Sequence, residues 1–115
     1  MVLLTVGGTY LLLILLSLFF YFKPPQTINS LYGYRTSRSM KNPENWHFAN
    51  KLSARFMIKG SVIGLLIFLV SFVLLKDKIA ISTLTLANLI ILCISLVAVI
   101  PLVEIKLKKF EKSRS

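Results

Sequence analysis

Residues 79–103 read IAISTLTLANLIILCISLVAVIPLV, a stretch of 25 residues without a charged side chain. A helix that crosses the hydrocarbon core of a bilayer needs about 20 mostly apolar residues. Two further runs meet this requirement, because Met1–Phe22 has no charge and Phe56–Leu75 is interrupted only by Lys59. The sequence therefore predicts an all-α membrane protein with three transmembrane helices, over about residues 1–22, 56–75 and 79–103.

The composition supports a single membrane domain over residues 1–115. The chain is 56% hydrophobic and its mean hydropathy is +0.77, and a domain of this size could not bury that much apolar side chain in water. The first run does not have the form of a cleaved signal peptide, since it lacks a basic start and ends in the bulky cluster Phe19–Phe22. Such a cluster suits the interface at the end of a retained membrane helix.

The net charge of +10 is distributed unevenly. Seven basic residues lie in 23–59 and five follow residue 103, whereas the turn at 76–78 carries two and the N-terminus none. Positive loops stay on the cytoplasmic side, so we expect the N-terminus outside and both the loop 23–55 and the basic tail 104–115 in the cytoplasm. We expect this charge to attract anionic lipid headgroups, and we expect no nucleic-acid partner.

The sequence between the first two runs predicts a loop followed by a long helix. Lys23-Pro24-Pro25 ends the first helix, because proline lacks an amide donor and restricts the residue before it. Residues 26–41 show no sustained periodicity and indicate an ordered, irregular loop. Asn42-Pro43-Glu44 is typical of a helix start, and the helix is expected to run unbroken over 43–75.

Four positions in the spans bear on helix packing. Gly60 and Gly64 form a pair of small residues that lets helices approach closely, either within the chain or between two copies in a homo-oligomer. Asn88, near the middle of the bilayer, needs a hydrogen-bond partner, either as a link between helices or as a lining residue of a polar cavity. Pro101 is expected to bend or loosen the last turn, with the tail after it lying at the membrane surface.

The sequence contains no recognisable catalytic or metal-binding constellation. His47 and Cys93 are the single histidine and the single cysteine, and the four acids are scattered beside lysines or at helix starts. There is no zinc-ligand spacing, no phosphate-binding loop and no glycine-rich dinucleotide motif. We therefore expect no enzymatic activity, no cofactor and no metal.

The segment 28–50, INSLYGYRTSRSMKNPENWHFAN, concentrates polar and aromatic residues between the apolar runs. Arg35 and Arg38 can present planar donor groups to a phosphate or a carboxylate. The alternative is that these arginines only anchor the chain to lipid headgroups while the aromatic rings form an interfacial belt. The candidate contact residues are Asn29, Tyr32, Gly33, Tyr34, Arg35, Thr36, Arg38, Ser39, Asn42, Trp46 and Asn50.

The same segment resembles the conserved loop of the SdpI family, bacterial integral membrane proteins named for an immunity protein that protects against a secreted killing toxin. The shared pattern is N-x-x-x-G-x-R-T-x-x-S-x-x-x-x-x-x-W-x-x-A-N, preceded by Pro24-Pro25 and followed by two further spans. By this resemblance the motif positions are Asn29, Gly33, Arg35, Thr36, Trp46 and Asn50.

The resemblance implies a protein of the bacterial inner membrane that confers resistance to a membrane-active peptide toxin, by binding it or by shielding its target. The immunity protein that names the family has additional spans before this domain, and the chain resembles the stand-alone form with three spans. Two other functions are left open. One is a membrane-anchored scaffold that recruits a cytoplasmic regulator, and the other is a small-molecule or lipid transporter with a continuous polar cavity past Asn88.

Overall fold

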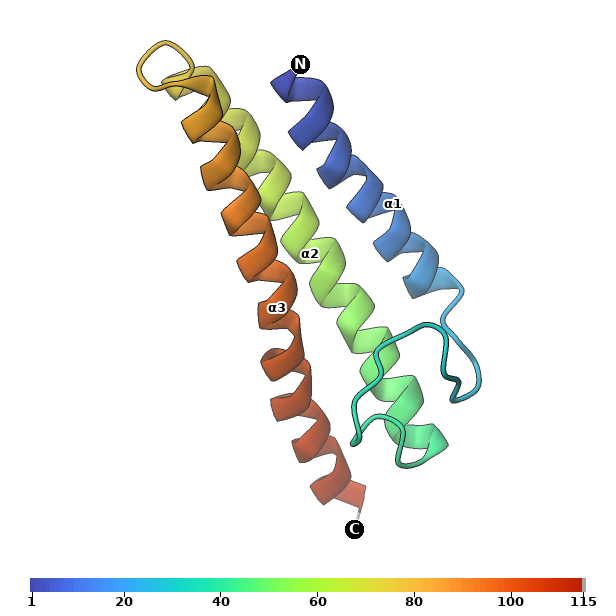
Figure 1. Cartoon of the computed structure of the whole chain (residues 1–115). Helices are drawn as coiled ribbons and strands as arrows, with labels where there is room; N and C mark the ends of the chain where they lie inside the picture. Colours follow the sequence, from blue (N-terminus) through green and yellow to red (C-terminus); the bar gives the residue numbers. More distant parts are fainter. Residues whose placement is uncertain (115) are drawn as a thin grey trace.

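Three helices lie side by side in the computed structural model, which describes residues 1–114. A π-helical stretch, η1 (Leu3–Gly7), continues directly into α1 (Gly8–Phe22), and it is followed by α2 (Pro43–Leu75) and α3 (Ile81–Arg114). α2 packs against both other helices, and no strand occurs in the described residues (Figure 1). The prediction of an all-α protein with three helices long and apolar enough to span a membrane is confirmed.

α2 begins where its capping residues predict. The Asn42 side chain accepts a hydrogen bond from the backbone N–H of Asn45 at 2.8 Å, and Pro43 occupies the first helical position. Glu44 lies in the first turn, where a carboxylate complements the positive end of the helix. The 33 residues of α2 extend for about 50 Å, so the helix is about 20 Å longer than a hydrocarbon core of about 30 Å.

α3 differs from the prediction at its C-terminal part. We expected Pro101 to bend or loosen the last turn of the helix and a basic tail to follow from residue 104. In the structure Pro101 lies inside the helix, which continues to Arg114. The segment after Pro101 is therefore part of the bundle and runs beside the first half of α2, which it contacts directly.

Apolar contacts explain why this extension of α3 stays helical. Val103 and Leu107 are fully buried and pack in one cluster with Ala49 of α2. Further along, the rings of Phe48 and Phe110 stack with their centroids 4.2 Å apart. The contact buries apolar surface that both helices would otherwise leave in water, which stabilises the extension despite its high content of lysine.

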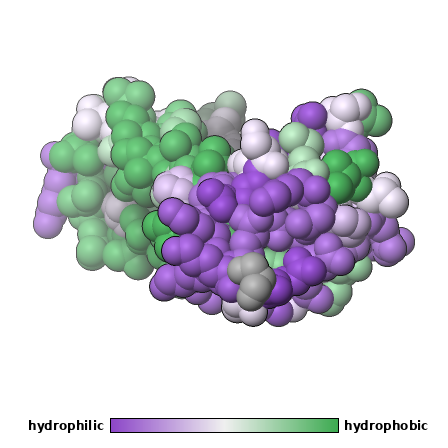
Figure 2. All heavy atoms as spheres, turned by 90° about the horizontal axis from the view of Figure 1, so that it is seen from below, coloured by the Kyte–Doolittle hydropathy of each residue, from purple (hydrophilic) through white to green (hydrophobic). Residues whose placement is uncertain are grey.

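The outward surface of the spans requires a membrane. Only 17% of the most apolar window of η1–α1, 17% of that of α2 and 22% of that of α3 is buried inside the protein. The remaining apolar side chains point outward and need hydrocarbon around them. Figure 2, seen from the end that carries the C-terminus, shows hydrophilic side chains gathered at this end and hydrophobic ones beyond it. The protein is therefore a membrane protein.

Tyr10 and Gly64 form a close contact between α1 and α2. Tyr10 is only 1% exposed, and its ring lies against the backbone at Gly64. A methyl group added at Gly64 would lie 2.5 Å from Cε1 of Tyr10. The same ring stacks on Phe68 at 6.5 Å between centroids. Gly64 thus lets two helices of one chain approach closely, whereas a methyl at Gly60 would meet nothing within 4 Å.

Asn88 lies buried between the helices in the same region. Its side-chain amide donates to the carbonyl of Leu84 at 2.9 Å and to the hydroxyl of Ser71 on α2 at 3.4 Å. Its backbone carbonyl accepts from the Tyr10 hydroxyl at 3.4 Å. These contacts connect Asn88 to both neighbouring helices.

The two glycines of α2 give a matched test of this packing. We expect Gly64→Ala to lower the free energy of unfolding by about 1–3 kcal/mol, because the new methyl group overpacks the Tyr10 ring. Gly60→Ala is the control and should leave stability unchanged or slightly raised, since its methyl meets open space. Thermal unfolding of the purified protein in detergent measures both. Equal losses in the two variants would contradict the role assigned to Gly64.

Candidate functional site

The segment 23–42, here called the motif loop, crosses α2 between the C-terminal end of α1 and α3 (Figure 1). Asn50 of α2 fixes its central part. The side-chain oxygen of Asn50 accepts a hydrogen bond from the backbone N–H of Tyr34 at 2.6 Å, and its amide donates to the carbonyl of Trp46 at 2.9 Å. Asn50 is 4% exposed, so these bonds satisfy an amide that is out of contact with water.

Trp46 and Gly33 complete this attachment. The fully buried Trp46 ring donates from Nε1 to the carbonyl of Pro25 at 2.7 Å, which holds the start of the loop against α2. Gly33 has a φ of 109°, a conformation that residues with a side chain rarely adopt. A methyl group there would lie 2.6 Å from Oδ1 of Asn50 and 2.8 Å from Cγ of Pro25. Gly33, Trp46 and Asn50 are thus in contact with one another.

Thr36 and Ser39 build a compact turn within the loop. The N–H of Thr36 donates to Oγ of Ser39 at 2.8 Å, and the N–H of Ser39 donates to Oγ1 of Thr36 at 3.1 Å. The Ser39 hydroxyl also donates to the carbonyl of Tyr34 at 3.0 Å. Asn45 attaches this turn to α2, because its side-chain amide donates to the carbonyl of Arg38 at 3.0 Å.

Asn29 organises the first half of the loop. Its side-chain oxygen accepts from the N–H groups of Leu31 and Tyr32, both at 2.9 Å. Its backbone carbonyl accepts from Nε of Arg35 at 3.0 Å. The Tyr32 ring lies 5.9 Å from that of Phe20 at the end of α1. This half of the loop is therefore folded on itself and contacts α1.

Glu104 of α3 holds the loop from the other side. Its Oε1 accepts hydrogen bonds from the Tyr34 hydroxyl at 2.7 Å and from the Thr36 hydroxyl at 2.6 Å. The Tyr34 hydroxyl also lies 3.1 Å from the carbonyl of Ile100. Burial and the neighbouring Glu104 carboxylate raise the pKa of Tyr34, so the phenol stays protonated and remains a donor. Nε of Arg38 lies 3.5 Å from the second oxygen of Glu104.

Glu111 provides a second acidic contact about two helical turns further along α3. Arg38 and Lys41 of the loop both pair with its carboxylate, Lys41 at 3.3 Å. Hydrogen bonding to the Asn45 side chain, then to Arg38 and Lys41, lowers the pKa of Glu111 to about 2. The acidic positions of α3 are thus electrostatic partners of the loop.

The pKa of Glu111 predicts a stability change at acid pH. Because the pKa is lower in the folded protein than its ordinary value of 4.5, the ionised carboxylate stabilises the fold above that value. This stabilisation is lost as the pH falls towards about 2. We expect the wild type to have a higher melting temperature than Glu111→Gln at about pH 6, with the difference vanishing near pH 2. A difference that does not change with pH would contradict the assignment.

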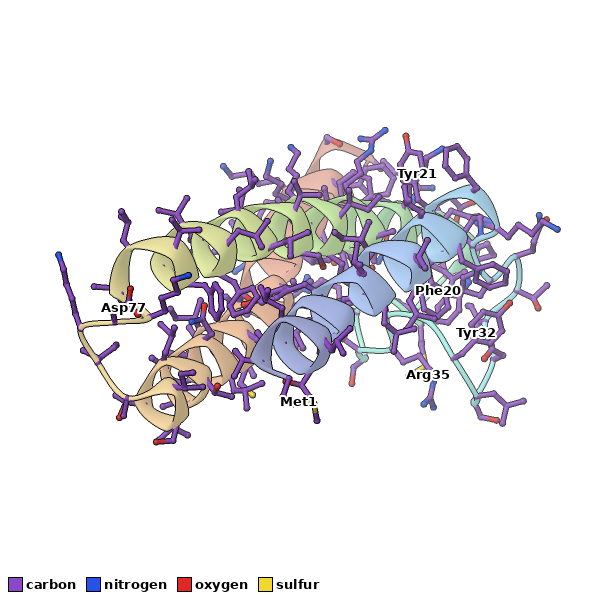
Figure 3. All side chains as sticks on the ribbon, turned by 90° about the horizontal axis from the view of Figure 1, so that it is seen from above. Met1, Phe20, Tyr21, Tyr32, Arg35 and Asp77 are labelled. Atoms are coloured by element: carbon purple, nitrogen blue, oxygen red, sulfur yellow. The ribbon has the colours of Figure 1, made fainter. Side chains whose placement is uncertain are left out.

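A cavity of about 310 Å³ lies where the loop, α1, α2 and α3 meet. One wall of the cavity is formed by four residues of α2, namely Asn50, Ser53, Ala54 and Met57. The motif loop closes one end with Pro25, Gly33 and Tyr34. Phe20 of α1 and three residues of α3, Leu96, Val99 and Ile100, complete the lining. Figure 3 shows Phe20 and Tyr32 close together, with Arg35 projecting outward from the loop on the same side of the bundle.

Comparison with known proteins assigns this chain to a family. The family profile described as the SdpI/YfhL protein family matches residues 26–103, which is more than half of the chain. The chain belongs to this family. It is also 45% identical over 60 residues to a Bacillus subtilis (strain 168) protein described as "Uncharacterized protein YfhL". The aligned residues cover 50% of this chain and 51% of that relative, so the chain spans about half of its length. No solved structure matches the chain.

The family motif therefore corresponds to a set of attachments between a loop and its neighbouring helices. The structure brings together all the candidate residues of the loop and of the start of α2, whereas Gly60, Gly64 and Asn88 lie apart in the membrane part of the bundle. Arg38 is engaged in ion pairs with α3. Arg35 is exposed, and among residues 1–114 it makes one hydrogen bond, through Nε.

Sequence reasoning missed Glu104 and Glu111 as members of the site. The signal that could have found them is their spacing of seven residues, which places both carboxylates on one face of a helix. They are also the two acids in a segment otherwise rich in lysine. The spacing alone does not show that the partners of these two carboxylates are residues of the motif loop.

Proposed function

We propose that this chain is a bacterial immunity protein that makes the membrane resistant to a membrane-active peptide toxin, such as a bacteriocin. Membership of the SdpI/YfhL family supports this proposal, as does the membrane fold. The observation that carries it is the cavity at the end of the spans, whose end is closed by Gly33 and Tyr34 of the motif loop. A protein that binds a toxin segment, or shields the toxin's target, would need such a site at the depth of the bilayer surface.

We further propose that the protein acts by binding and not by catalysis. The polar motif side chains hold the loop through hydrogen bonds, as Asn50 and Ser39 do. The contacts of Asn88 with Leu84 and Ser71 give no support to a polar transport path, and the pairing of Arg38 with α3 gives none to recruitment of a regulator by this residue.

The proposed orientation places the motif loop in the cytoplasm and the N-terminus outside. It rests on the twelve basic residues at the loop end against two at the turn 76–78. An external toxin would then have to be met within the bilayer. A fluorescent-protein fusion at the C-terminus should be bright and an alkaline phosphatase fusion there inactive. The opposite pattern would contradict this orientation.

The immunity function can be tested with a panel of secreted peptide toxins. Each toxin is added to sensitive cells that express the wild type, Arg35→Ala or neither protein. The wild type should protect against at least one toxin at matched membrane levels. Arg35→Ala should protect less, because it removes the exposed guanidinium of the residue that follows Tyr34 in the cavity lining, whereas Lys78→Ala at the opposite end serves as the control. Failure of the wild type against every toxin would overturn immunity, and equal protection by Arg35→Ala would remove Arg35 from the mechanism.

A further inference from the structure

The cavity beneath the motif loop is suited to an apolar occupant. Three polar groups line it, from Tyr34, Asn50 and Ser53, and each is already used within the protein. The Tyr34 hydroxyl donates to Glu104, the Asn50 side chain bonds the backbone of Tyr34 and Trp46, and the Ser53 hydroxyl donates to the carbonyl of Asn50. A polar ligand would therefore find few free partners, whereas a hydrocarbon chain requires none.

The position of the cavity makes it accessible from the bilayer. α1 and α3 both pack on α2, and among the described residues their Cα atoms do not approach each other within 8 Å; the first helix reaches α3 through η1 and through the Tyr10 hydroxyl, which donates to the carbonyl of Asn88. Between them, the cavity is bordered by side chains that are partly exposed, with Leu96 at 37% and Ile100 at 49%. The loop closes the end that faces water, so the opening is lateral, towards lipid.

The positive charge of Arg35 favours an occupant with an anionic headgroup. Arg35 follows Tyr34, which lines the cavity, and its terminal guanidinium nitrogens make no hydrogen bond within residues 1–114. Glu104 and Glu111, two of the three acids at this end, are paired with the loop. A phosphate could therefore bind the Arg35 guanidinium in a bidentate manner.

We propose that the cavity binds one acyl chain of an anionic phospholipid, with its phosphate at Arg35. A volume of about 310 Å³ lies at the lower end of the range for ligand pockets, which suits a single acyl chain. The lipid would fill the gap between α1 and α3 and brace the motif loop. This inference does not depend on the immunity function, because its test contains no toxin.

Trp46 provides the readout. It is the single tryptophan of the chain, and it lies beside Gly33, which lines the cavity. Bromine atoms on an acyl chain in the cavity would quench its fluorescence. The purified protein is placed in vesicles containing brominated phosphatidylglycerol or brominated phosphatidylcholine. We expect stronger quenching of the wild type by the anionic lipid, with an apparent affinity that falls roughly fivefold in Arg35→Gln and is unchanged in Lys78→Gln.

Two substitutions by phenylalanine test the cavity itself. Ala54→Phe fills it and should remove the quenching by the anionic lipid, while Val97→Phe, on an outward face of α3 that is 66% exposed, should not. Leu96→Phe is a milder filling variant that serves if Ala54→Phe does not fold. Quenching that persists in a folded filling variant would overturn the cavity as the binding site. Equal quenching by both lipids would overturn the role of the headgroup and of Arg35.

Discussion

Gly33→Ala is expected to lower the free energy of unfolding by about 3 kcal/mol, the largest effect of a single methyl group in this chain. Two causes add. The φ of 109° is strained for any residue with a side chain, and the new methyl would lie 2.6 Å from Oδ1 of Asn50. Asn50 would have to move, which breaks its hydrogen bond with the N–H of Tyr34. Thermal unfolding in detergent measures the loss, and Trp46 fluorescence reports the detachment of the loop.

A double-mutant cycle isolates the part of the loss that is due to the contact with Asn50. Asn50→Ala removes the nearest atom that the new methyl would meet, while the contact with Cγ of Pro25 at 2.8 Å and the positive φ at Gly33 remain. We therefore expect Gly33→Ala to destabilise the Asn50→Ala background by less than it destabilises the wild type. Gly8→Ala, where a methyl meets nothing within 4 Å, is the control for the substitution itself. If Gly33→Ala melts at the wild-type temperature, the attachment of the loop at this point is not important for stability.

Glu104→Ala is expected to destabilise the protein by a comparable amount, about 3 kcal/mol, because one carboxylate accepts two hydrogen bonds from the loop. The Tyr34 and Thr36 hydroxyls would both lose this acceptor. Glu104→Gln keeps an acceptor oxygen and should lose less. The expected result is a lower melting temperature together with faster cleavage by trypsin at the basic residues of the loop.

The control for this prediction is Asp77→Ala. Asp77 lies in the turn at the other end of the bundle, in residues 76–78, and is remote from the loop (Figure 3). Asp77→Ala removes one negative charge, as Glu104→Ala does, but leaves the contacts of the motif loop unchanged. If Glu104→Ala and Asp77→Ala behave alike in melting and in proteolysis, the effect is one of net charge, and Glu104 does not hold the loop.

Local signals explain what could be predicted of the fold. The span lengths follow from runs of uncharged residues, and the start of α2 follows from Asn42 and Pro43, whose effects act within one turn. The motif itself also could be recognised, because its residues recur at fixed offsets within 28–50. Non-local contacts explain what could not. The continuation of α3 past Pro101 depends on Leu107 packing against α2, a contact that no local pattern encodes.

The sequence by itself determined that this is a three-helix membrane protein with a polar, family-specific loop, because hydrophobic length and helix capping are properties of short segments. Only the tertiary structure decided what the loop residues do. It assigned Arg38 to the acids of α3 and left Arg35 exposed, although the two arginines are three residues apart. It also made Glu104 a partner of Thr36, 68 residues away. Such pairings depend on the rotation and register of helices, which are set by packing across the whole bundle.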